Sequence, residues 1–225
     1  MTPADITVVI PTLNEAQSIA NSVHSAIAAG ATEIIVSDGG SSDRTLEIAS
    51  EAGASKIVRS LAGRGVQMNS GAHLAKKHFI LFLHADNQLS GQALEQICVH
   101  ENAVWGAFRQ RIDSPKKIYR FIEWGNTCRV QWRGMAFGDQ GFFVRRALFK
   151  ELGGFAEMPL MEDVEMSQRL RRIEKPAVLN GPLIVNARRW EKQGLLRQTL
   201  MNWQIQFAYF RGVPADQLAR KYYGN

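Results

Sequence analysis

Short apolar runs alternate with segments of helical periodicity over the first hundred residues. Runs rich in Ile, Val and Phe predict strands buried on both faces at residues 6–10, 33–37, 56–58 and 79–83. Apolar and small residues recur at helical spacing at residues 15–29, 43–52, 67–77 and 90–101. This β-α-β-α-β-α-β order predicts an α/β fold, with a mostly parallel sheet and helices on both of its faces.

The second half of the chain is less regular. Apolar runs there predict strands at residues 104–111, 142–144, 177–179 and 183–185. Helical spacing predicts helices at residues 116–129, 146–152 and 162–172, and a helix containing Trp and Phe from Leu195 onward. Neither an internal repeat nor a linker long enough to divide the chain is present in its 225 residues. We therefore expect one domain with a helical tail.

Composition excludes several classes of protein. Hydrophobic residues are 45% and charged residues 21% of the chain, which is ordinary for a globular protein and excludes disorder, collagen and coiled coil. The longest run of large apolar residues covers residues 79–83, whereas a membrane-spanning helix needs about 20, so none is expected. We find no pattern of a secretory signal, and Cys98 and Cys128 are expected to be free thiols in a reducing cytoplasm.

The net charge is unevenly distributed along the chain. Residues 1–108 carry 6 Lys and Arg against 10 Asp and Glu, a balance of −4. Residues 109–225 carry 21 against 11, a balance of +10. This asymmetry favours an anionic partner for the second half, such as a phosphorylated substrate, a membrane surface or a nucleic acid. A solvated basic face is the alternative.

Acidic residues follow the predicted parallel strands, at the edge where such sheets bind ligands. Asp38 directly follows a buried strand, and Gly39 and Gly40 allow the backbone to approach a ligand closely. A carboxylate here can accept hydrogen bonds from a base or ribose, whereas Asp43 is expected to cap the next helix. Asp86 ends the most apolar strand and can bind Mg²⁺ together with substrate phosphates, or cap the following helix.

Further candidates lie in loops and at predicted helix ends. Residues 63–65, followed by Asn69, form a glycine-rich segment in which Arg64 and backbone amides could meet an anion. A plain flexible turn is the alternative. Glu162 and Asp163 are the densest acidic cluster of the basic half, suited to general base catalysis or simply to a helix dipole. Residues 188–190 (RRW) could clamp a pyrophosphate or be surface charge beside a half-buried Trp.

Several motifs are absent from the chain. It has no Gly-x-Gly-x-x-Gly after the first strand and no P-loop, which argues against dinucleotide dehydrogenases and P-loop NTPases. The five histidines show no zinc-ligand pattern, and no Gly-x-Ser-x-Gly elbow is present. The tail combines Trp203, Phe207, Tyr209 and Phe210 with basic residues, which suits core packing, dimerisation or contact with a membrane surface.

Five motifs in this order resemble those of the family 2 glycosyltransferases, nucleotide-sugar enzymes with the GT-A fold. They are residues 9–15 (VIPTLNE), 37–45 (SDGGSSDRT), 83–86 (LHAD), 138–146 (GDQGFFVRR) and 161–163 (MED). Residues 63–69 (GRGVQMN) and 188–190 further resemble a small bacterial branch, the "transferase 2" proteins associated with radical-SAM and selenodomain proteins. The resemblance covers most of the chain, from Val8 to about Trp190.

The resemblance implies a Rossmann-like sheet and a role for each motif. Pro11, Asn14 and Glu15 are implied to line a nucleotide pocket, with Asp38 binding the base. The whole set implied to bind the nucleotide is Pro11, Thr12, Asn14, Glu15, Asp38, Gly40, Arg64, Asn69, His84, Ala85 and Asp86. We expect a GT-A domain over residues 1–190, with a nucleotide-binding half at 1–108 and an acceptor half at 109–190, and a basic helical extension over residues 191–225.

The resemblance also implies the chemistry. Asp86 corresponds to the metal-binding Asp of an Asp-x-Asp motif and is implied to hold Mg²⁺ or Mn²⁺ against the diphosphate. Asp163, with Glu162 beside it, is implied to be the general base that deprotonates the acceptor hydroxyl, so that the anomeric carbon is inverted. The metal, with Arg64 or Arg189, is implied to stabilise the leaving nucleoside diphosphate. Candidates for contact with phosphate or acceptor are Asp139, Gln140, Arg188, Arg189 and Trp190.

Two departures from the family pattern qualify the resemblance. His84 replaces the first Asp of Asp-x-Asp, so the usual contact of that Asp with the nucleotide sugar is in doubt. Of the Gln-x-x-Arg-Trp motif of processive synthases, residues 186–190 keep only the Arg-Trp end. A processive polysaccharide synthase is therefore not expected.

The expected function is metal-dependent, inverting transfer of a single sugar, from a UDP-sugar in preference to other nucleotide sugars, to an unknown acceptor hydroxyl. A nucleotidyltransferase is disfavoured because residues 11–15 contain neither Gly nor a basic residue. A non-catalytic nucleotide-sugar-binding protein is the other alternative. The expected partner is an acceptor that is anionic or lipid-linked, and binding of nucleic acid is not expected. A homodimer is one further candidate. Peripheral contact of the tail with the inner face of the membrane is another. The expected location is the cytoplasm.

Overall fold

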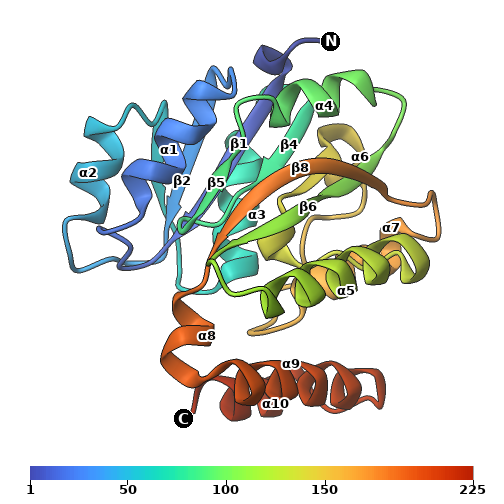
Figure 1. Cartoon of the computed structure of the whole chain (residues 1–225). Coiled ribbons are helices and arrows are strands. Elements are labelled where there is room, and N and C mark those ends of the chain that lie inside the picture. The colour runs from blue at the N-terminus through green and yellow to red at the C-terminus, as the bar shows by residue number, and fades with distance from the viewer. Residues whose placement is uncertain (225) are drawn as a thin grey trace.

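Eight strands join into one mixed sheet in the described part of the chain (Figure 1). The computed structural model describes residues 1–224, apart from the side chains of Arg189 and Gln193. The order across the sheet is β3-β2-β1-β4-β7-β6-β8-β5. The strands are β1 (Ile6–Thr12), β2 (Glu33–Asp38), β3 (Lys56–Arg59), β4 (Phe79–Phe82), β5 (Asn87–Leu89), β6 (Trp105–Asp113), β7 (Phe142–Arg145) and β8 (Ala177–Asn186).

Helices cover both faces of the sheet, as predicted. The α-helices are α1 (Ile19–Ala28), α2 (Thr45–Glu51), α3 (Arg64–Leu74), α4 (Ala93–Val99), α5 (Ile118–Arg133), α6 (Arg146–Glu151), α7 (Glu162–Leu170), α8 (Arg188–Gln193), α9 (Leu195–Phe210) and α10 (Ala215–Tyr223). Two short 3₁₀ helices are η1 (Pro3–Asp5) and η2 (Gly138–Gln140). One apolar cluster joins the sheet to α1, α2 and α4, and a second joins the opposite face to α3, α5, α6 and α7.

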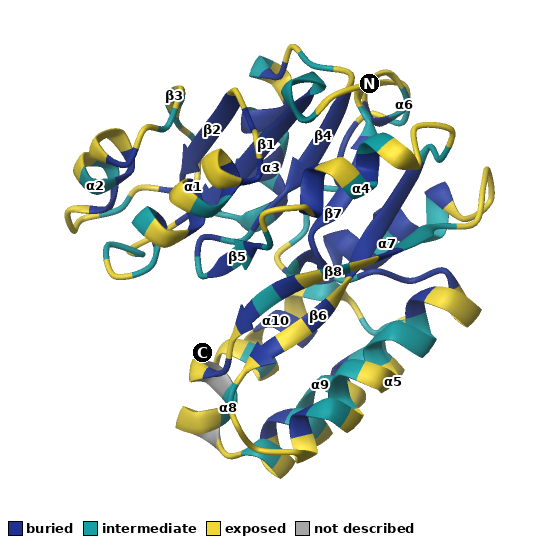
Figure 2. Ribbon diagram, turned by 45° about the horizontal axis from the view of Figure 1, so that its top comes forward, coloured by how far each residue is buried: buried dark blue, intermediate teal, exposed yellow. Residues whose placement is uncertain are grey.

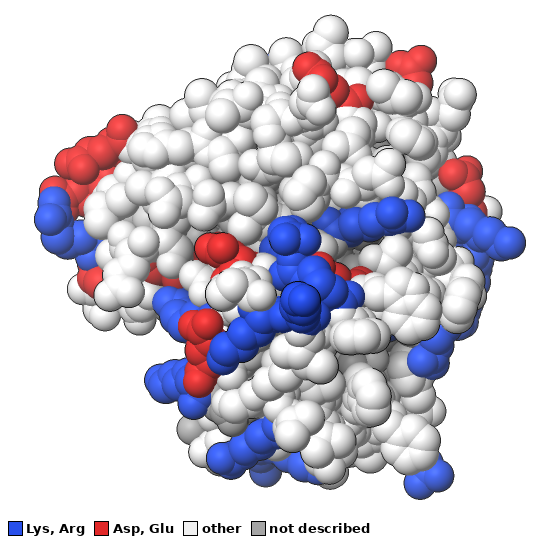
Figure 3. Space-filling view, viewed as in Figure 1, with Lys and Arg blue, Asp and Glu red and all other residues white. Residues whose placement is uncertain are grey.

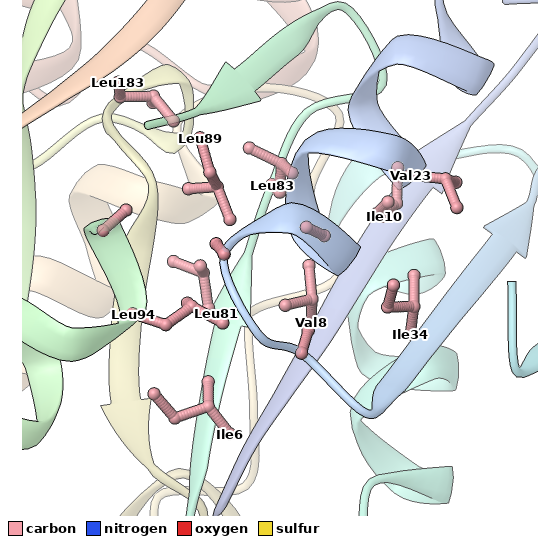
Figure 4. Close-up of a cluster of buried hydrophobic side chains, with 14 of the residues drawn as sticks. Ile6, Val8, Ile10, Val23, Ile34, Leu81, Leu83, Leu89, Leu94 and Leu183 are labelled. Carbon is pink, nitrogen blue, oxygen red and sulfur yellow. The ribbon is translucent and has the colours of Figure 1, made fainter. Parts of the chain in front are cut away.

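The first four strands pair in parallel with one another, which confirms the sequence prediction, and β6 and β8 of the second half pair in parallel as well. β1 pairs in parallel with β2 and β4, and β2 pairs in parallel with β3. Figure 4 shows Val8 and Ile10 of β1, together with Leu81 of β4 and Val23 of α1, in one buried layer. Because β1, β2 and β4 point in the same direction, the polar segments that follow them meet at one edge of the sheet.

The carboxyl-terminal half departs from the prediction at β8. The two strands expected at residues 177–179 and 183–185 are one strand, which continues through a cis peptide bond between Gly181 and Pro182. The pairing of β8 with β6 shifts in register between Phe108 and Gln110 of β6. β7 inserts antiparallel between β4 and β6, and the three-residue strand β5 pairs antiparallel with β8. β5 is too short to carry a periodic signal, so the sequence did not predict it.

Helix boundaries differ from the predicted ones at residues with special backbone geometry. α3 begins at Arg64 rather than at residue 67, with Gly63 at φ +142° as its N-cap. α1 begins at Ile19 rather than at residue 15, after Asn14 has taken a left-handed conformation at φ +54°. α4 begins at Ala93 rather than at residue 90, with Gln92 as its N-cap.

The carboxyl-terminal helices form a separate layer beneath the sheet (Figure 1). Ile205 of α9 and Leu218 of α10 belong to a buried cluster with Leu160, Met161 and Val164, which lie at the start of α7. The predicted helical tail is therefore packed against the segment that carries the expected general base. In the described chain, no helix is long and apolar enough to cross a membrane.

Candidate functional site

A cavity of about 440 Å³ opens at the carboxyl ends of β1 and β4. Its wall combines the end of β1, the loop after β4, η2, the start of α7 and the end of β8. Many of the residues singled out from the sequence line it together. They are Pro11, Thr12, Glu15, Arg64, His84, Ala85, Asp86, Asp139, Asp163, Arg188 and Trp190.

Three other predicted residues hold the loops beside the cavity. The Asp38 side chain is fully buried and accepts hydrogen bonds from the backbone N–H groups of Gly40 (3.0 Å) and Ser41 (3.0 Å). The Oδ1 atom of Asn14 accepts a hydrogen bond of 2.9 Å from the backbone N–H of Ser42. Asn14 and Asp38 thus fix the two strand-end loops, and in this conformation neither they nor Gly40 is part of the cavity wall.

Two further predicted residues, Asn69 and Gln140, hold the backbone on the other side of the site. The Asn69 amide donates to the carbonyl of Phe155 and accepts from its N–H, both at 2.9 Å. Gln140 Oε1 accepts from Arg129 Nη2 at 2.7 Å and from the N–H of Phe137 at 3.0 Å. The hydrogen bonds of Asn69 therefore hold α3 against the backbone at Phe155, and those of Gln140 hold η2 in place.

Asp163 lies in the first turn of α7 with its carboxylate facing the cavity. Its Oδ2 accepts a hydrogen bond of 2.7 Å from the N–H of Gly138, and its Oδ1 accepts one of 2.7 Å from the N–H of Val164. A Cβ at Gly138 would lie 2.8 Å from His84 Nε2 and 3.4 Å from Asp163 Oδ2. Only glycine therefore allows η2 to approach both side chains so closely. Met161, the N-cap residue of α7, has a left-handed backbone at φ +73°, a strained geometry typical of functional sites.

The partly exposed Arg64 forms an ion pair with the buried Glu162 beside Asp163. Arg64 Nε binds Glu162 Oε1, and Arg64 Nη2 lies 3.4 Å from Asp163 Oδ2. Burial raises the pKa of Asp163 to about 6, with Arg64 opposing the shift and the negative charge of Glu162 adding to it. A carboxyl group with a pKa near neutrality is suited to proton transfer.

A second group of charges lies on the opposite side of the cavity. Arg188 Nη2 contacts Glu15 Oε1 at 3.1 Å and lies 3.8 Å from Asp86 Oδ2. Burial raises the pKa of Asp86, and the negative charges of Glu15 and Asp139 raise it further while Arg188 opposes them. Arg188 contacts two of these three carboxylates, and Asp139 adds a third negative charge near Asp86, which leaves local negative charge that a cation could neutralise.

Asp86 and Asp139 are suited to a divalent cation that takes most of its ligands from phosphate oxygens and water. Asp139 Oδ1 is buried in the cavity wall without a hydrogen-bond partner among the described residues. Within the described chain, no three His, Cys, Asp or Glu side chains form a complete metal cage. Mg²⁺ and Mn²⁺ accept one or two carboxylates together with phosphate oxygens and water, so Asp86 and Asp139 match their preferences.

The sequence missed the part of the wall that α5 contributes. Arg129 Nη1 donates to Asn126 Oδ1 at 2.9 Å, and its guanidinium lies 3.8 Å from the centre of the Phe137 ring. Burial lowers the pKa of Arg129 to about 10. Helical spacing predicted a basic helix here. Which of its arginines faces the cavity, however, depends on how α5 packs against the sheet.

The sequence also missed the wall that α9 and α10 contribute. Thr199, Asn202 and Gln206 of α9 line the cavity together with Tyr222 and Tyr223 of α10. The hydroxyl of Thr199 is buried there without a hydrogen-bond partner in the part of the chain that is described. No local motif marks these residues, because they reach the cavity only through the fold of the tail. Arg189 was predicted to stabilise the leaving diphosphate, but its side chain is not among those that the structure describes.

Structural comparison confirms the expected GT-A fold. The S. aureus protein TarS in complex with UDP superposes with a TM-score of 0.66 and 16% identity, covering 83% of this chain and 60% of that chain. Glucosyl-3-phosphoglycerate synthase from Mycobacterium tuberculosis, in complex with Mg²⁺ and UDP, superposes with a TM-score of 0.54 and 18% identity. That match covers 80% of this chain and 68% of the mycobacterial chain. At such identities the likeness establishes the fold alone.

Sequence comparison identifies the family. Glycosyltransferase AglJ of Haloferax volcanii is 41% identical over 64 residues, which cover 28% of this chain and 21% of AglJ. The chain therefore matches well under two thirds of the length of this curated relative. The family model for glycosyl transferase family 2 matches residues 7–153, a segment that contains β1 to β7 and both Asp86 and Asp139. Since this segment is more than half of the chain, the chain belongs to glycosyl transferase family 2.

Proposed function

We propose that the protein transfers a single sugar from a nucleoside-diphosphate sugar to an acceptor hydroxyl, with inversion and with the help of Mg²⁺ or Mn²⁺. One observation carries the proposal: a buried carboxyl with a pKa near 6, Asp163, and a carboxylate suited to a cation, Asp86, line one cavity. The first is suited to activating an acceptor and the second to holding the diphosphate of a donor. Membership of the family supports nucleotide-sugar transfer.

Asp163 acts as the general base. The N–H groups of Gly138 and Val164 each occupy one of its oxygens at 2.7 Å, which fixes the carboxylate and leaves lone pairs directed into the cavity. The acceptor hydroxyl gives its proton to this carboxylate while its oxygen forms the bond to the anomeric carbon. The bond from that carbon to the diphosphate oxygen breaks on the opposite face, which inverts the centre.

The leaving nucleoside diphosphate is held on the other side of the cavity. Asp86 and Asp139 would hold the divalent cation, which neutralises the developing charge on the diphosphate when it is bound. Arg188 contacts Glu15 and Asp86 from the rim, and its guanidinium can turn to phosphate oxygens with a suitable fork of donors. Arg64 is committed to Glu162, so its proposed role is to position Asp163 rather than to bind phosphate.

The nucleoside lies against the loops that follow β1 and β2. Pro11, Thr12 and Glu15 line the cavity there, and the hydroxyl of Thr12 is buried without a hydrogen-bond partner among the described residues. Asp38 binds the base after the loop of residues 39–42 opens, because in the present conformation its oxygens accept from that loop. UDP is the proposed nucleotide, a choice supported by the UDP complexes of TarS and of the mycobacterial synthase.

Thermal-shift titration with UDP, GDP, CDP and dTDP, each with and without Mn²⁺, tests the donor site. A ligand at 100 times its dissociation constant stabilises a protein by about 2.7 kcal/mol, and we expect this for UDP with Mn²⁺. Failure of all four nucleotides to raise the melting temperature would contradict the proposal.

Asp163→Asn separates transfer from binding. We expect the variant to keep the UDP-dependent shift and to lose UDP-sugar turnover by a factor of about 10²–10⁴, the usual contribution of a general base. Asp113→Asn, at an exposed position at the end of β6, is the matched control and should behave as wild type. A loss of UDP binding in Asp163→Asn would refute the base assignment. Full turnover would do the same.

A further inference from the structure

Large apolar residues on α5 and α9 are exposed. Figure 2 marks the exposed positions of both helices in yellow. On α9 they recur at the spacing of one helical face, which points away from the buried residues Gln198 and Ile205. Trp132 on α5 is 79% exposed and Leu196 on α9 is 77% exposed. The exposed aromatic face comprises Phe121, Trp124 and Trp132 of α5 and Leu196, Leu200, Trp203, Phe207 and Phe210 of α9.

α5 contacts the segment before α9 at one end and α9 itself at the other. At one end, the ring of Tyr119 on α5 meets that of Trp190, just before α9, with 5.9 Å between the ring centres. At the other end, the guanidinium of Arg133 on α5 lies 5.3 Å from the ring centre of Phe210 on α9. Figure 2 shows exposed positions on both α5 and α9. Exposed large apolar side chains gathered on neighbouring helices usually mark an interaction site.

The surface is basic as well as aromatic. Residues 195–210 contain Arg197 and no Asp or Glu. On α5, Glu123 forms an ion pair of 2.9 Å with Arg120, so its charge is already neutralised. Figure 3 shows Lys and Arg side chains over the lower half of the molecule, where α5, α8 and α9 lie. The remaining positive charges beside the aromatic residues are Lys116, Lys117, Arg133, Arg197 and Arg211.

We propose that the exposed aromatic face docks on the anionic surface of a lipid bilayer. Trp and Phe side chains bury well at the level of the lipid headgroups, and flanking Lys and Arg are attracted to anionic lipids. A second copy of the chain would bring two basic surfaces together, whereas a bilayer supplies the complementary charge. Charge complementarity therefore favours the membrane over self-association.

Docking has a consequence for the site. Trp203 belongs to the exposed aromatic face and also lines the cavity. A bilayer that binds this face therefore lies against the mouth of the cavity, where it can present the headgroup of a lipid as the acceptor. This consequence rests on the proposed transfer function, whereas docking itself does not.

Co-sedimentation with vesicles tests the docking. The full chain is mixed with vesicles of phosphatidylcholine alone, or of phosphatidylcholine with phosphatidylglycerol, and the bound fraction is measured. We expect binding to the anionic vesicles and a blue shift of Trp fluorescence. Trp124→Ser combined with Trp132→Ser should lower the partition coefficient at least about tenfold, because each side chain loses its burial in lipid. Lys116→Gln with Lys117→Gln should lower it roughly fivefold per lysine.

Two controls keep the outcome unambiguous. Leu61→Ser and Val99→Ser remove side chains that are 80% exposed on other parts of the surface, and should leave vesicle binding unchanged. Sedimentation velocity without vesicles reports self-association, and circular dichroism reports folding of each variant. Absence of binding to anionic vesicles would overturn the proposal. So would a dimer that dissociates in the Trp124→Ser variant, or vesicle binding that the double tryptophan variant retains. None of these readouts measures sugar transfer, so failure of docking is separate from failure of the proposed function.

Discussion

Arg64 of α3 reaches across the site to bind Glu162, and its second nitrogen lies 3.4 Å from Asp163 Oδ2. Glu162 is 1% exposed, so its charge is compensated inside the protein rather than by water. The pair thus brings one positive and one negative charge next to the proposed base. Burial of Asp163 and the charge of Glu162 outweigh Arg64, and the pKa of Asp163 rises.

This balance predicts the acid limb of the pH–rate profile. Asp163 must be ionised to take a proton, and its pKa is raised to about 6. The turnover rate should therefore be steady above this pH and fall about tenfold per pH unit below it. Initial rates of UDP-sugar turnover between pH 4.5 and 8, with circular dichroism at each pH, check this. A profile that stays flat down to a pH near 4 would assign the base elsewhere.

Glu162→Gln should change the pH at which the turnover rate falls on the acidic side. The substitution removes a negative charge that raises the pKa of Asp163 and leaves Arg64, which lowers it. The midpoint of the acid limb should shift to lower pH, while the free energy of unfolding falls by about 1.5–3 kcal/mol because Arg64 loses one charged hydrogen-bond partner and keeps Asp163 beside it. The same pH series on the variant, at a temperature below its melting point, measures both effects. Glu165→Gln changes a carboxylate in the same turn of α7 that is paired with Arg169 instead, and should leave the midpoint in place.

Asp86→Asn should remove the extra stabilisation that Mn²⁺ gives to the UDP-bound protein. The carboxylate of Asp86 is the proposed anionic ligand of the cation, and an amide keeps its shape without its charge. We expect UDP alone to stabilise the variant as it does wild type, and Mn²⁺ to add little. Isothermal titration of Mn²⁺ into the UDP-bound protein gives the affinity directly. An unchanged Mn²⁺ affinity would remove Asp86 from the metal site.

The strand-end half of the site could be predicted from the sequence. Buried strands are visible as β-branched runs, and parallel strands must end on one edge, so Thr12, Asp86 and their neighbours were expected to meet. The structure brings them to one cavity. Asp163 was found through its acidic neighbours and its place in a family motif, and it too lines that cavity.

The remainder depends on long-range packing that no local pattern encodes. Arg129 faces the cavity because Val130, one residue on, packs into the core beneath the sheet. Thr199 and Gln206 reach the site because Ile205 and Leu218 join a cluster with Met161, more than forty residues earlier in the chain. The β8 strand was divided in two because Gly181 and Pro182 are turn residues by local preference, which the sheet overrides.

Gly138→Ala should damage the site more than the fold. The added Cβ would lie 2.8 Å from His84 Nε2 and 3.4 Å from Asp163 Oδ2, so η2 or the imidazole must shift. The Gly138 N–H would then no longer hold Asp163 Oδ2 at 2.7 Å, and the base would lose its orientation. We expect turnover to fall about 10²-fold, as for displacements of about 1 Å in other sites. The overpacking itself should cost about 1–3 kcal/mol of stability.

Gly125→Ala is the matched control for this substitution. Gly125 lies within α5, and a Cβ there would meet no atom within 4 Å. Alanine should stabilise the helix by about 0.5–1 kcal/mol and leave turnover unchanged. Comparing the melting temperature and turnover of both variants separates a general effect of a methyl group from displacement of Asp163. If Gly138→Ala retains wild-type turnover, close contact of η2 with His84 and Asp163 is not required for the reaction.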